Sequence, residues 1–175
     1  VLDVIYASGD PNSEDGKQTA FKADPNFDVG MLLFENVLAA QTGRGVHTAS
    51  DPELVGKPSS EIERFPTRGS LSNTIAAFPR LWWSPTESIE VYGGPLVAFS
   101  AAKVNDPLNS RIAGGAFRNA LNGEPGSYLG TELDLGLRYR TYFGDSELTT
   151  GAEVAAFEPG TAFNNDSGNP MRTIY

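Results

Sequence analysis

Two acidic and two basic side chains interrupt an otherwise hydrophobic run at residues 128–140, YLGTELDLGLRYR. Glu132, Asp134, Arg138 and Arg140 are separated by even numbers of positions, so in a β-strand they point to the same side. Carboxylates and guanidinium groups on one face hold water and polar solutes, or pair with each other across strands. The run therefore predicts a strand with one chemically active polar face.

The opposite face of this strand is hydrophobic. It carries Leu129, Leu133, Leu135, Leu137 and Tyr139. In a water-soluble sandwich these side chains pack on a core and the charges meet solvent. In a transmembrane barrel they meet lipid and the charges line a wet lumen. One strand is compatible with both environments.

Composition narrows the class of protein. The 175 residues include 13 Lys and Arg against 22 Asp and Glu, and the net charge of −9 argues against nucleic acid as a partner. The absence of cysteine excludes disulfide scaffolds and thiolate chemistry. No apolar run reaches the roughly 18 residues of a membrane-spanning helix, so a barrel is the remaining way to cross a membrane.

The same alternation recurs along the chain and predicts an all-β fold. Pro79 and Pro95 lie inside two of the expected strands, and each removes a ladder hydrogen bond, which weighs against those strands. Both prolines lie on the apolar face, so the strands are retained. The expected strands are residues 1–8, 71–83, 88–100, 127–142 and 147–157.

The connections between these strands fall into two length classes. SPTE (84–87) and GDSE (144–147) predict tight turns, whereas 101–126 and 158–170 are long, polar and rich in Gly, Asn and Pro. Short periplasmic turns and long extracellular loops are typical of outer-membrane barrels. The pattern favours an antiparallel transmembrane β-barrel segment.

One segment, FDVGMLLFENVLAAQTG (27–43), is predicted to be a loop helix rather than a strand. As a helix it ends at Gly43 and lies inside one long extracellular excursion over residues 9–70, which keeps every later turn on the expected side. As a strand it would place SPTE outside. Its apolar helical face consists of Val29, Leu32, Leu33, Val37 and Ala40.

Aromatic residues gather near the two tight turns. Trp82 and Trp83 precede one turn, and Tyr139, Tyr142 and Phe143 precede the other. Aromatic girdles of this kind lie at membrane interfaces. Ordinary strand aromatics are the alternative.

A longer stretch resembles a known family. Residues 128–163, YLGTELDLGLRYRTYFGDSELTTGAEVAAFEPGTAF, begin with Leu-Gly-x-Glu-Leu-Asp and end with Pro-Gly-x-Ala-Phe. This stretch resembles the C-terminal part of the alginate export porin family of Gram-negative outer membranes. DPEL (51–54) and the order of segments in 71–101 are also similar, so the likeness covers about 48–163. It implies a large barrel whose arginine-lined lumen passes an acidic polysaccharide.

The five expected full strands are fewer than the eight of the smallest barrels. We therefore expect residues 1–175 to be the C-terminal portion of a single outer-membrane β-barrel, with strands at about 71–157 and strands missing at both ends. The opening VLDVIYASGD has no signal peptide, and the terminal MRTIY is too short to cross a membrane.

The predicted function is an outer-membrane channel or exporter for a polar solute or polysaccharide in a Gram-negative bacterium. Its other partners would be the lipid bilayer, lipopolysaccharide and further envelope proteins. The alternative is a structural or adhesive barrel with a plugged lumen. A soluble carbohydrate-binding sandwich is the third hypothesis. The residues predicted to line the lumen and contact solute are Arg80, Tyr92, Glu132, Asp134, Arg138, Arg140 and Glu153.

These charges are expected to face opposite charges across the strands. The turn at GDSE would place Glu153 opposite Arg138, and Arg80 would lie near Glu90 or Tyr92. Such pairs would make a wall without a role in selectivity. Alternatively, they would make a graded lumen, basic toward the periplasm and acidic toward the outside.

No catalytic, metal or cofactor site is predicted. The single histidine, His47, has Ser50 and Asp51 nearby, but a loop provides no preorganised base or oxyanion hole. The protein is therefore not expected to be an enzyme.

The loop at 8–18, SGDPNSEDGKQ, offers oxygen ligands for calcium but departs from the EF-hand pattern because Gly16 comes one residue late. Polar turn chemistry explains the same residues. The oxygen-bearing side chains are those of Asp10, Asn12, Glu14 and Asp15.

Overall fold

The structure, a computed structural model, describes residues 1–12, 15, 17, 19–24, 27, 29–38 and 71–171. Within these residues, three short helical segments accompany the strands: the π-helix η1 (Leu33–Leu38), α3 (Pro107–Ile112) and the 3-10 helix η3 (Thr161–Phe163). Among the described residues, no helix has the length and apolar character that a membrane crossing requires. The strands are β1 (Leu2–Ala7), β2 (Thr74–Pro79), β3 (Leu81–Thr86), β4 (Ile89–Phe99), β5 (Tyr128–Phe143) and β6 (Ser146–Pro159).

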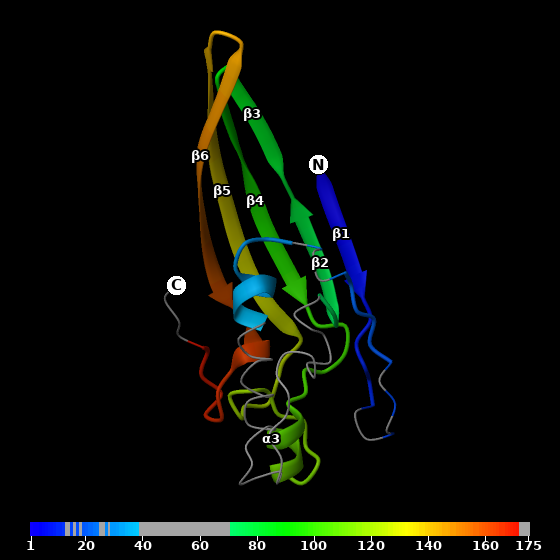
Figure 1. The fold of residues 1–175 in the computed structure, drawn as a ribbon. Helices are drawn as coiled ribbons and strands as arrows, with labels where there is room; N and C mark the ends of the chain where they lie inside the picture. The colour runs from blue at the N-terminus through cyan, green and yellow to red at the C-terminus, as the bar shows by residue number, and fades with distance from the viewer. Residues whose placement is uncertain are drawn as a thin grey trace, which may run out of the picture.

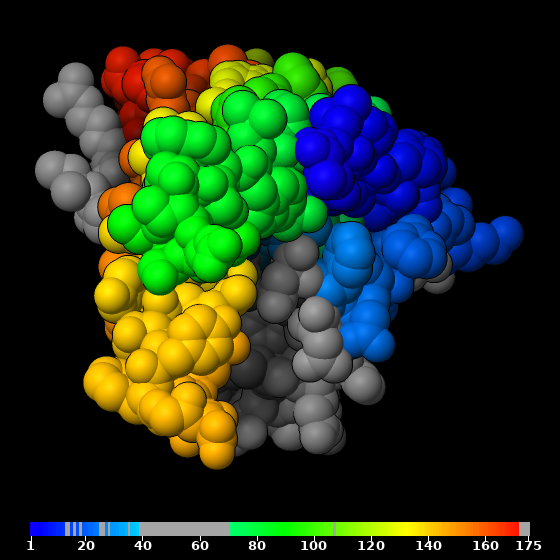
Figure 2. All heavy atoms as spheres, turned by 90° about the horizontal axis from the view of Figure 1, so that it is seen from above, coloured from blue at the N-terminus to red at the C-terminus, as the bar shows by residue number. Residues whose placement is uncertain are grey.

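All six strands belong to one antiparallel sheet, which confirms the expected all-β architecture (Figure 1). Their spatial order is β1-β2-β4-β5-β6, and β3 also pairs with β4. The sheet is not closed, because β1 and β6 lie at its two edges. Viewed along the strands, the sheet forms an arc from β1 to the β5–β6 turn (Figure 2).

The two prolines interrupt the ladder at one level only. β2 and β3 pair with β4 in the same register, which puts Pro79 opposite Pro95. Neither proline has an N–H to donate, so pairing with β4 stops at this level and resumes in β3. The predicted strands form on both sides of this gap because the two missing donors coincide.

The short connections lie at one end of the sheet and the long ones at the other (Figure 1). Thr86 pairs with Ile89 and Phe143 pairs with Ser146, so both turns contain two residues. The prediction of a turn at SPTE (84–87) is therefore wrong in position, because β3 runs through Thr86 and the turn follows it.

The two faces of the sheet are covered to different extents. Glu132 is 0% exposed on the face against which η1 packs, which we call the inner face. On the opposite, outer face, Leu133, Leu135 and Leu137 are 45%, 48% and 48% exposed. The large exposed hydrophobic side chains of the outer face are Leu2, Val4, Tyr6, Ile75, Leu81, Trp83, Phe99, Leu133, Leu135, Leu137, Tyr139, Phe143, Leu148 and Val154.

Leu129 departs from the leucine face to which it was assigned. It is buried, because Ala98 pairs with Gly130 whereas Phe99 pairs with Tyr128, which leaves Leu129 in a bulge. Gly130 has φ of +139°, a conformation that favours glycine. The bulge turns Leu129 toward the core.

The predicted aromatic girdle divides between the two faces. Trp83, Tyr139 and Phe143 lie on the outer face near the short turns. Trp82 and Tyr142 alternate with them and therefore lie on the inner side, where Trp82 pairs with Tyr92.

The hydrophobic core lies between the inner face and the segment at 29–38. Leu33, Phe34 and Val37 of this segment are buried together with Leu96 and Leu129 of the sheet. A helix does form within the predicted segment, but η1 spans only Leu33–Leu38 of it. Val29, Leu33 and Val37 of the predicted apolar face are buried, and so is Phe34, which was not assigned to that face. Ala40 and Gly43 lie outside the described residues.

The long loops after β4 and β6 are joined through the buried side chain of Asn119. Its Nδ2 donates to the carbonyls of Ala162 at 2.9 Å and Asn164 at 2.7 Å. Its Oδ1 accepts from the amides of Leu121 at 2.9 Å and Gly123 at 3.0 Å. One amide group therefore shapes its own loop and attaches the neighbouring loop to it.

We expect Asn119→Ala to separate these two loops. Four hydrogen bonds are lost, and at about 0.5–1.5 kcal/mol net for each the local stability falls by about 2–6 kcal/mol. Hydrogen exchange at the amides of Leu121 and Gly123 measures the loss. Asn169→Ala, at an exposed residue, is the control. Unchanged protection in Asn119→Ala would contradict the assignment.

Candidate functional site

The seven residues predicted to contact solute share the inner face of the sheet. The antiparallel register aligns alternate residues of neighbouring strands, so the polar face identified in β5 continues across β3, β4 and β6. That these residues contact solute stays a prediction. The seven are Arg80, Tyr92, Glu132, Asp134, Arg138, Arg140 and Glu153.

The register predicted for the β5–β6 hairpin is wrong by two residues. Arg138 pairs with Gly151, and Glu153 pairs with Gly136. The prediction assumed a longer loop, whereas Gly144, with φ of +58°, permits a turn of two residues. Glu153 consequently lies one inner-face position farther from the turn than Arg138.

Each inner-face arginine pairs with an acid of a neighbouring strand, as the alternation of charge predicted. These pairs are partly exposed, so each contributes only about 0–1 kcal/mol. The three arginines were expected to make one end of a lumen basic, but their charge is offset by these acids. The pairs are Arg80 Nε with Asp3 Oδ2 at 3.0 Å, Arg138 Nη1 with Glu90 Oε1 at 3.4 Å, and Arg140 Nε with Glu147 Oε1 at 2.9 Å.

Arg80 has a different environment from the one predicted. Its ion pair is with Asp3 of β1, a strand 77 positions away in the sequence. Its guanidinium carbon also lies 5.1 Å from the ring centroid of Phe78 and 5.2 Å from that of Trp82. The guanidinium group therefore contacts two aromatic rings, which belong to the residues two positions before and two positions after Arg80.

Tyr92 connects three strands of the inner face. Its ring lies over Gly136, where an added Cβ would approach the ring carbon Cζ to 2.3 Å. The guanidinium carbon of Arg138 lies 4.7 Å from the ring centroid, and the Tyr92 hydroxyl donates to Glu153 Oε1. Glycine at position 136 leaves room for the ring, and a Cβ there would displace it.

Glu132 binds the segment at 29–38 to the sheet. Its Oε1 accepts from the amides of Met31 at 2.5 Å and Leu32 at 2.7 Å, and its Oε2 accepts from the amide of Leu33 at 2.7 Å. These amides precede and begin η1, where backbone N–H groups lack helical partners. The fully buried carboxylate thus has three donors.

Gly30 makes this approach possible. Its φ is +70°, and an added Cβ would lie 2.7 Å from Leu96 Cδ2 and 3.1 Å from both carboxylate oxygens of Glu132. Glu132 was expected to face the lumen, and its burial was not predicted. The available signal was a glycine next to the apolar run, at the place where the chain turns into the helix.

Asp134 lies next to Glu132 on the same face and is 8% exposed. Its Oδ1 is buried and has no hydrogen-bond donor. The carboxyl groups of Glu132 and Glu153 are its acidic neighbours. A buried carboxylate oxygen without a donor is rare, because its desolvation is uncompensated.

The candidate calcium loop is described only in part. Asp10 Oδ1 accepts from the amide of Asn12 at 3.2 Å and from Thr19 Oγ1 at 3.2 Å, and Asp15 Oδ1 accepts from the amide of Lys17 at 2.9 Å. The two bonds from amides two residues farther along the chain are the turn-type bonds of the alternative interpretation, whereas the Thr19 bond joins residues nine positions apart. Glu14, Gly16 and the sequence around His47 lie outside the described residues.

Searches against family models, curated proteins and solved structures find no match to this chain. The resemblance to alginate export porins therefore stays a prediction.

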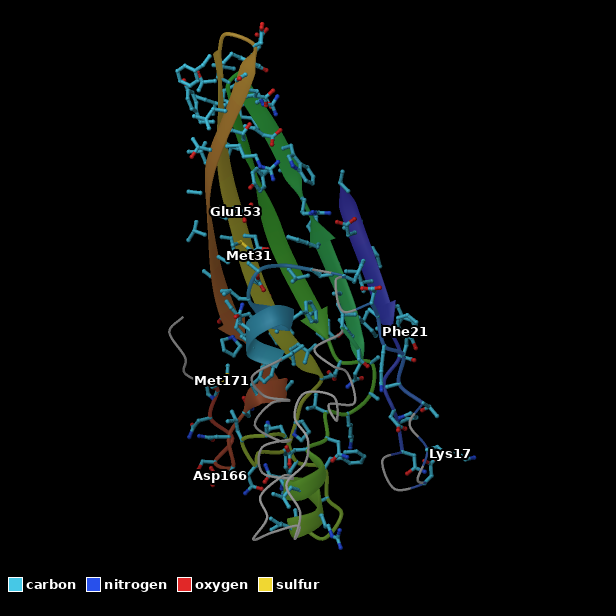
Figure 3. The ribbon with its side chains drawn as sticks, in the orientation of Figure 1. Lys17, Phe21, Met31, Glu153, Asp166 and Met171 are labelled. Carbon is cyan, nitrogen blue, oxygen red and sulfur yellow. The ribbon has the colours of Figure 1, made fainter. Side chains whose placement is uncertain are left out.

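The inner face combines paired charges with hydroxyl groups, such as those of Tyr92 and Thr149, at exposed or partly exposed positions. In Figure 3, Glu153 lies at mid-height of β6, between the short turns and the level of η1. Between η1 and the short turns, the polar side chains of this face can form weak hydrogen bonds and ion pairs with water and polar solutes. The half of the face nearer the long loops is covered by η1.

We expect Glu132→Gln to weaken the attachment of the 29–38 segment. Glutamine has one acceptor oxygen and an NH₂ group, so it cannot accept from three amides, and detachment becomes easier by about 1–3 kcal/mol. Hydrogen exchange at Met31, Leu32 and Leu33 measures this. Glu147→Gln, at a half-exposed position, is the matched control. Equal exchange in both variants would contradict the role of Glu132.

Proposed function

We propose that this sheet is part of the wall of a transmembrane β-barrel in the outer membrane of a Gram-negative bacterium, and that the barrel is a channel for polar solutes. The observation that carries the proposal is the distribution of charge between the two faces. Within the described strands, the outer face carries no Asp, Glu, Lys or Arg between Glu158 and the short turns. The inner face holds the charges.

A water-soluble sheet would present the opposite arrangement. Contiguous apolar patches on soluble proteins rarely exceed a few hundred Å², and larger ones mark membrane or protein contacts. Here the exposed leucines of β5 continue into Leu148 and Val154 of β6 and Leu2 and Val4 of β1. Lipid is the medium that removes such a surface from water on all strands at once.

The spacing of the aromatic residues supports the same environment. Tyr128 and Tyr139 are eleven positions apart in β5, which is about 37 Å of strand and, at a tilt of about 45°, about 26 Å across a bilayer. Apolar bands of such barrels are about 25 Å tall and flanked by aromatic girdles. The loop-end group is Tyr6, Phe99 and Tyr128, and the turn-end group is Trp83, Tyr139 and Phe143.

The open edges of the sheet require further strands under this proposal. Unpaired backbone groups are not tolerated in hydrocarbon, so barrels close. Within the described residues, β1 and β6 each pair on one side only. We therefore place additional strands beside both edges, the short turns in the periplasm and the long loops outside, in contact with lipopolysaccharide.

The segment at 29–38 would then lie inside the lumen. It packs on the loop half of the inner face, and no other segment that the structure describes packs on the turn half. A channel with one inward-folded segment conducts solutes through the remaining cross-section. The polar solute or polysaccharide would contact the seven residues named above.

The second candidate is a structural or adhesive barrel with a plugged lumen. The same inward-folded segment supports it, together with the extracellular loops that Asn119 joins into one body. In this case the loops bind an envelope partner and nothing passes. The two candidates differ in conductance.

The test uses the full-length protein from its native membrane. We expect extraction to require detergent and planar bilayers to show stepwise conductance. A detergent-requiring barrel without conductance would favour the plugged barrel. Release into buffer without detergent would contradict a membrane position and favour a soluble sandwich.

A pair of substitutions tests the lipid-facing side directly. Leu135→Arg lies in the middle of the proposed apolar band and should destabilise the inserted barrel by about 2–4 kcal/mol, whereas Leu148→Arg near the turn should cost about 0–1 kcal/mol. Both leucines are about half exposed on the outer face. Denaturant unfolding in lipid vesicles measures both. Equal, small effects would contradict the bilayer.

A further inference from the structure

The charges of the inner face do not balance. The three arginines each pair with one acid, and these pairs use Asp3, Glu90 and Glu147. On the strands that the structure describes, three further inner-face acids have no basic partner. They are Glu132, Asp134 and Glu153.

These three acids lie together. Glu132 and Asp134 are two positions apart in β5, and Glu153 pairs with Gly136, the next inner-face position of that strand. Asp134 interacts with both other carboxyl groups. The excess negative charge is therefore concentrated at mid-height of the face, where Figure 3 labels Glu153.

Two of the three carboxyl groups have hydrogen-bond donors. Glu132 accepts from three backbone amides, and Glu153 accepts from the Tyr92 hydroxyl. Asp134 Oδ1 has none, although Asp134 is more than nine-tenths buried. The acidic neighbours of Asp134 are Glu132 and Glu153, so a positively charged group, a proton or a cation, is the partner that would compensate this oxygen.

We infer that Asp134 and Glu153 form a weak binding site for cationic groups, and that it makes the pathway selective for cations and amine-bearing solutes. This inference rests on the proposed channel function. Rings and clusters of carboxylates select cations in channels, and conduction requires that each binding step be weak. Among the described residues, no three acidic, histidine or cysteine side chains are placed to hold a metal ion. Transient contact is therefore the role assigned, rather than a resident metal.

The inference changes the expected class of solute. The resemblance to alginate export porins implies an arginine-lined lumen for a polyanion. Here Arg80, Arg138 and Arg140 already have carboxylate partners, so on the described inner face their charge is offset. A polyuronate would meet the unpaired acids and be repelled.

The experiment is the reversal potential of the reconstituted full-length protein in a KCl gradient. We expect potassium to permeate better than chloride, and Asp134→Asn and Glu153→Gln each to lower this permeability ratio about threefold, because each removes one charge close to the permeating ion. Asp145→Asn removes the same charge in the exposed β5–β6 turn and should leave the ratio unchanged.

The outcomes separate this inference from the channel proposal. Chloride preference in the wild-type protein would overturn the cation site while leaving the channel intact. An unchanged ratio in Asp134→Asn and Glu153→Gln would also overturn it, since it would mean that a proton or another group already neutralises the pair. A detergent-requiring barrel without conductance would instead overturn the channel proposal.

Discussion

The structure depends on one buried carboxylate. Glu132 is fully buried and accepts three backbone hydrogen bonds from residues 31–33, which lead into η1. Those bonds compensate its desolvation, and they fix where the segment meets the sheet. Leu33 and Val37 are then placed in the same buried cluster as Leu96 and Leu129. This contact and the hydrophobic cluster together hold the segment on the inner face.

The position of the core explains why the charged face of the sheet is partly buried while the leucine face is exposed. In a soluble two-layer domain the leucine face is buried and the charged face is exposed. Here the loop half of the charged face is buried by a segment of the same chain, and the leucine face is left outside. The sheet therefore has an inner core next to its polar residues and an outer surface of exposed hydrophobic side chains.

Polar residues above the core are organised by contacts between neighbouring strands. Tyr92 lies over Gly136, beneath the guanidinium of Arg138, and donates to Glu153. Arg138 also pairs with Glu90, so four charged or hydroxyl groups form one network over β4, β5 and β6. Ion pairs of this kind stiffen a wall more than they stabilise it. The inner face is distinguished chemically by its acids that have no basic partner on the described strands, Glu132, Asp134 and Glu153.

Local pattern was sufficient to predict most of the architecture. The strands, their two faces, the division into short and long connections, and the apolar face of η1 follow from periods of two and of about 3.6 residues, which depend on neighbours in the sequence. The seven polar residues could be assigned to one face for the same reason. The strands that contain Pro79 and Pro95 were also predicted correctly. They form because the two prolines lie opposite each other, so the ladder is interrupted at one position only.

Other features were decided only by the tertiary structure. The β5–β6 register depended on whether Gly144 closes a turn of two residues, and a change of loop length there moves every cross-strand partner. The partner of Arg80 lies 77 positions away, and the amides that bury Glu132 lie about 100 positions away. Such contacts arise from the packing of segments that are distant in the chain. The sequence by itself therefore determined which residues share a face, and the fold decided which of them are covered, paired or left without a partner.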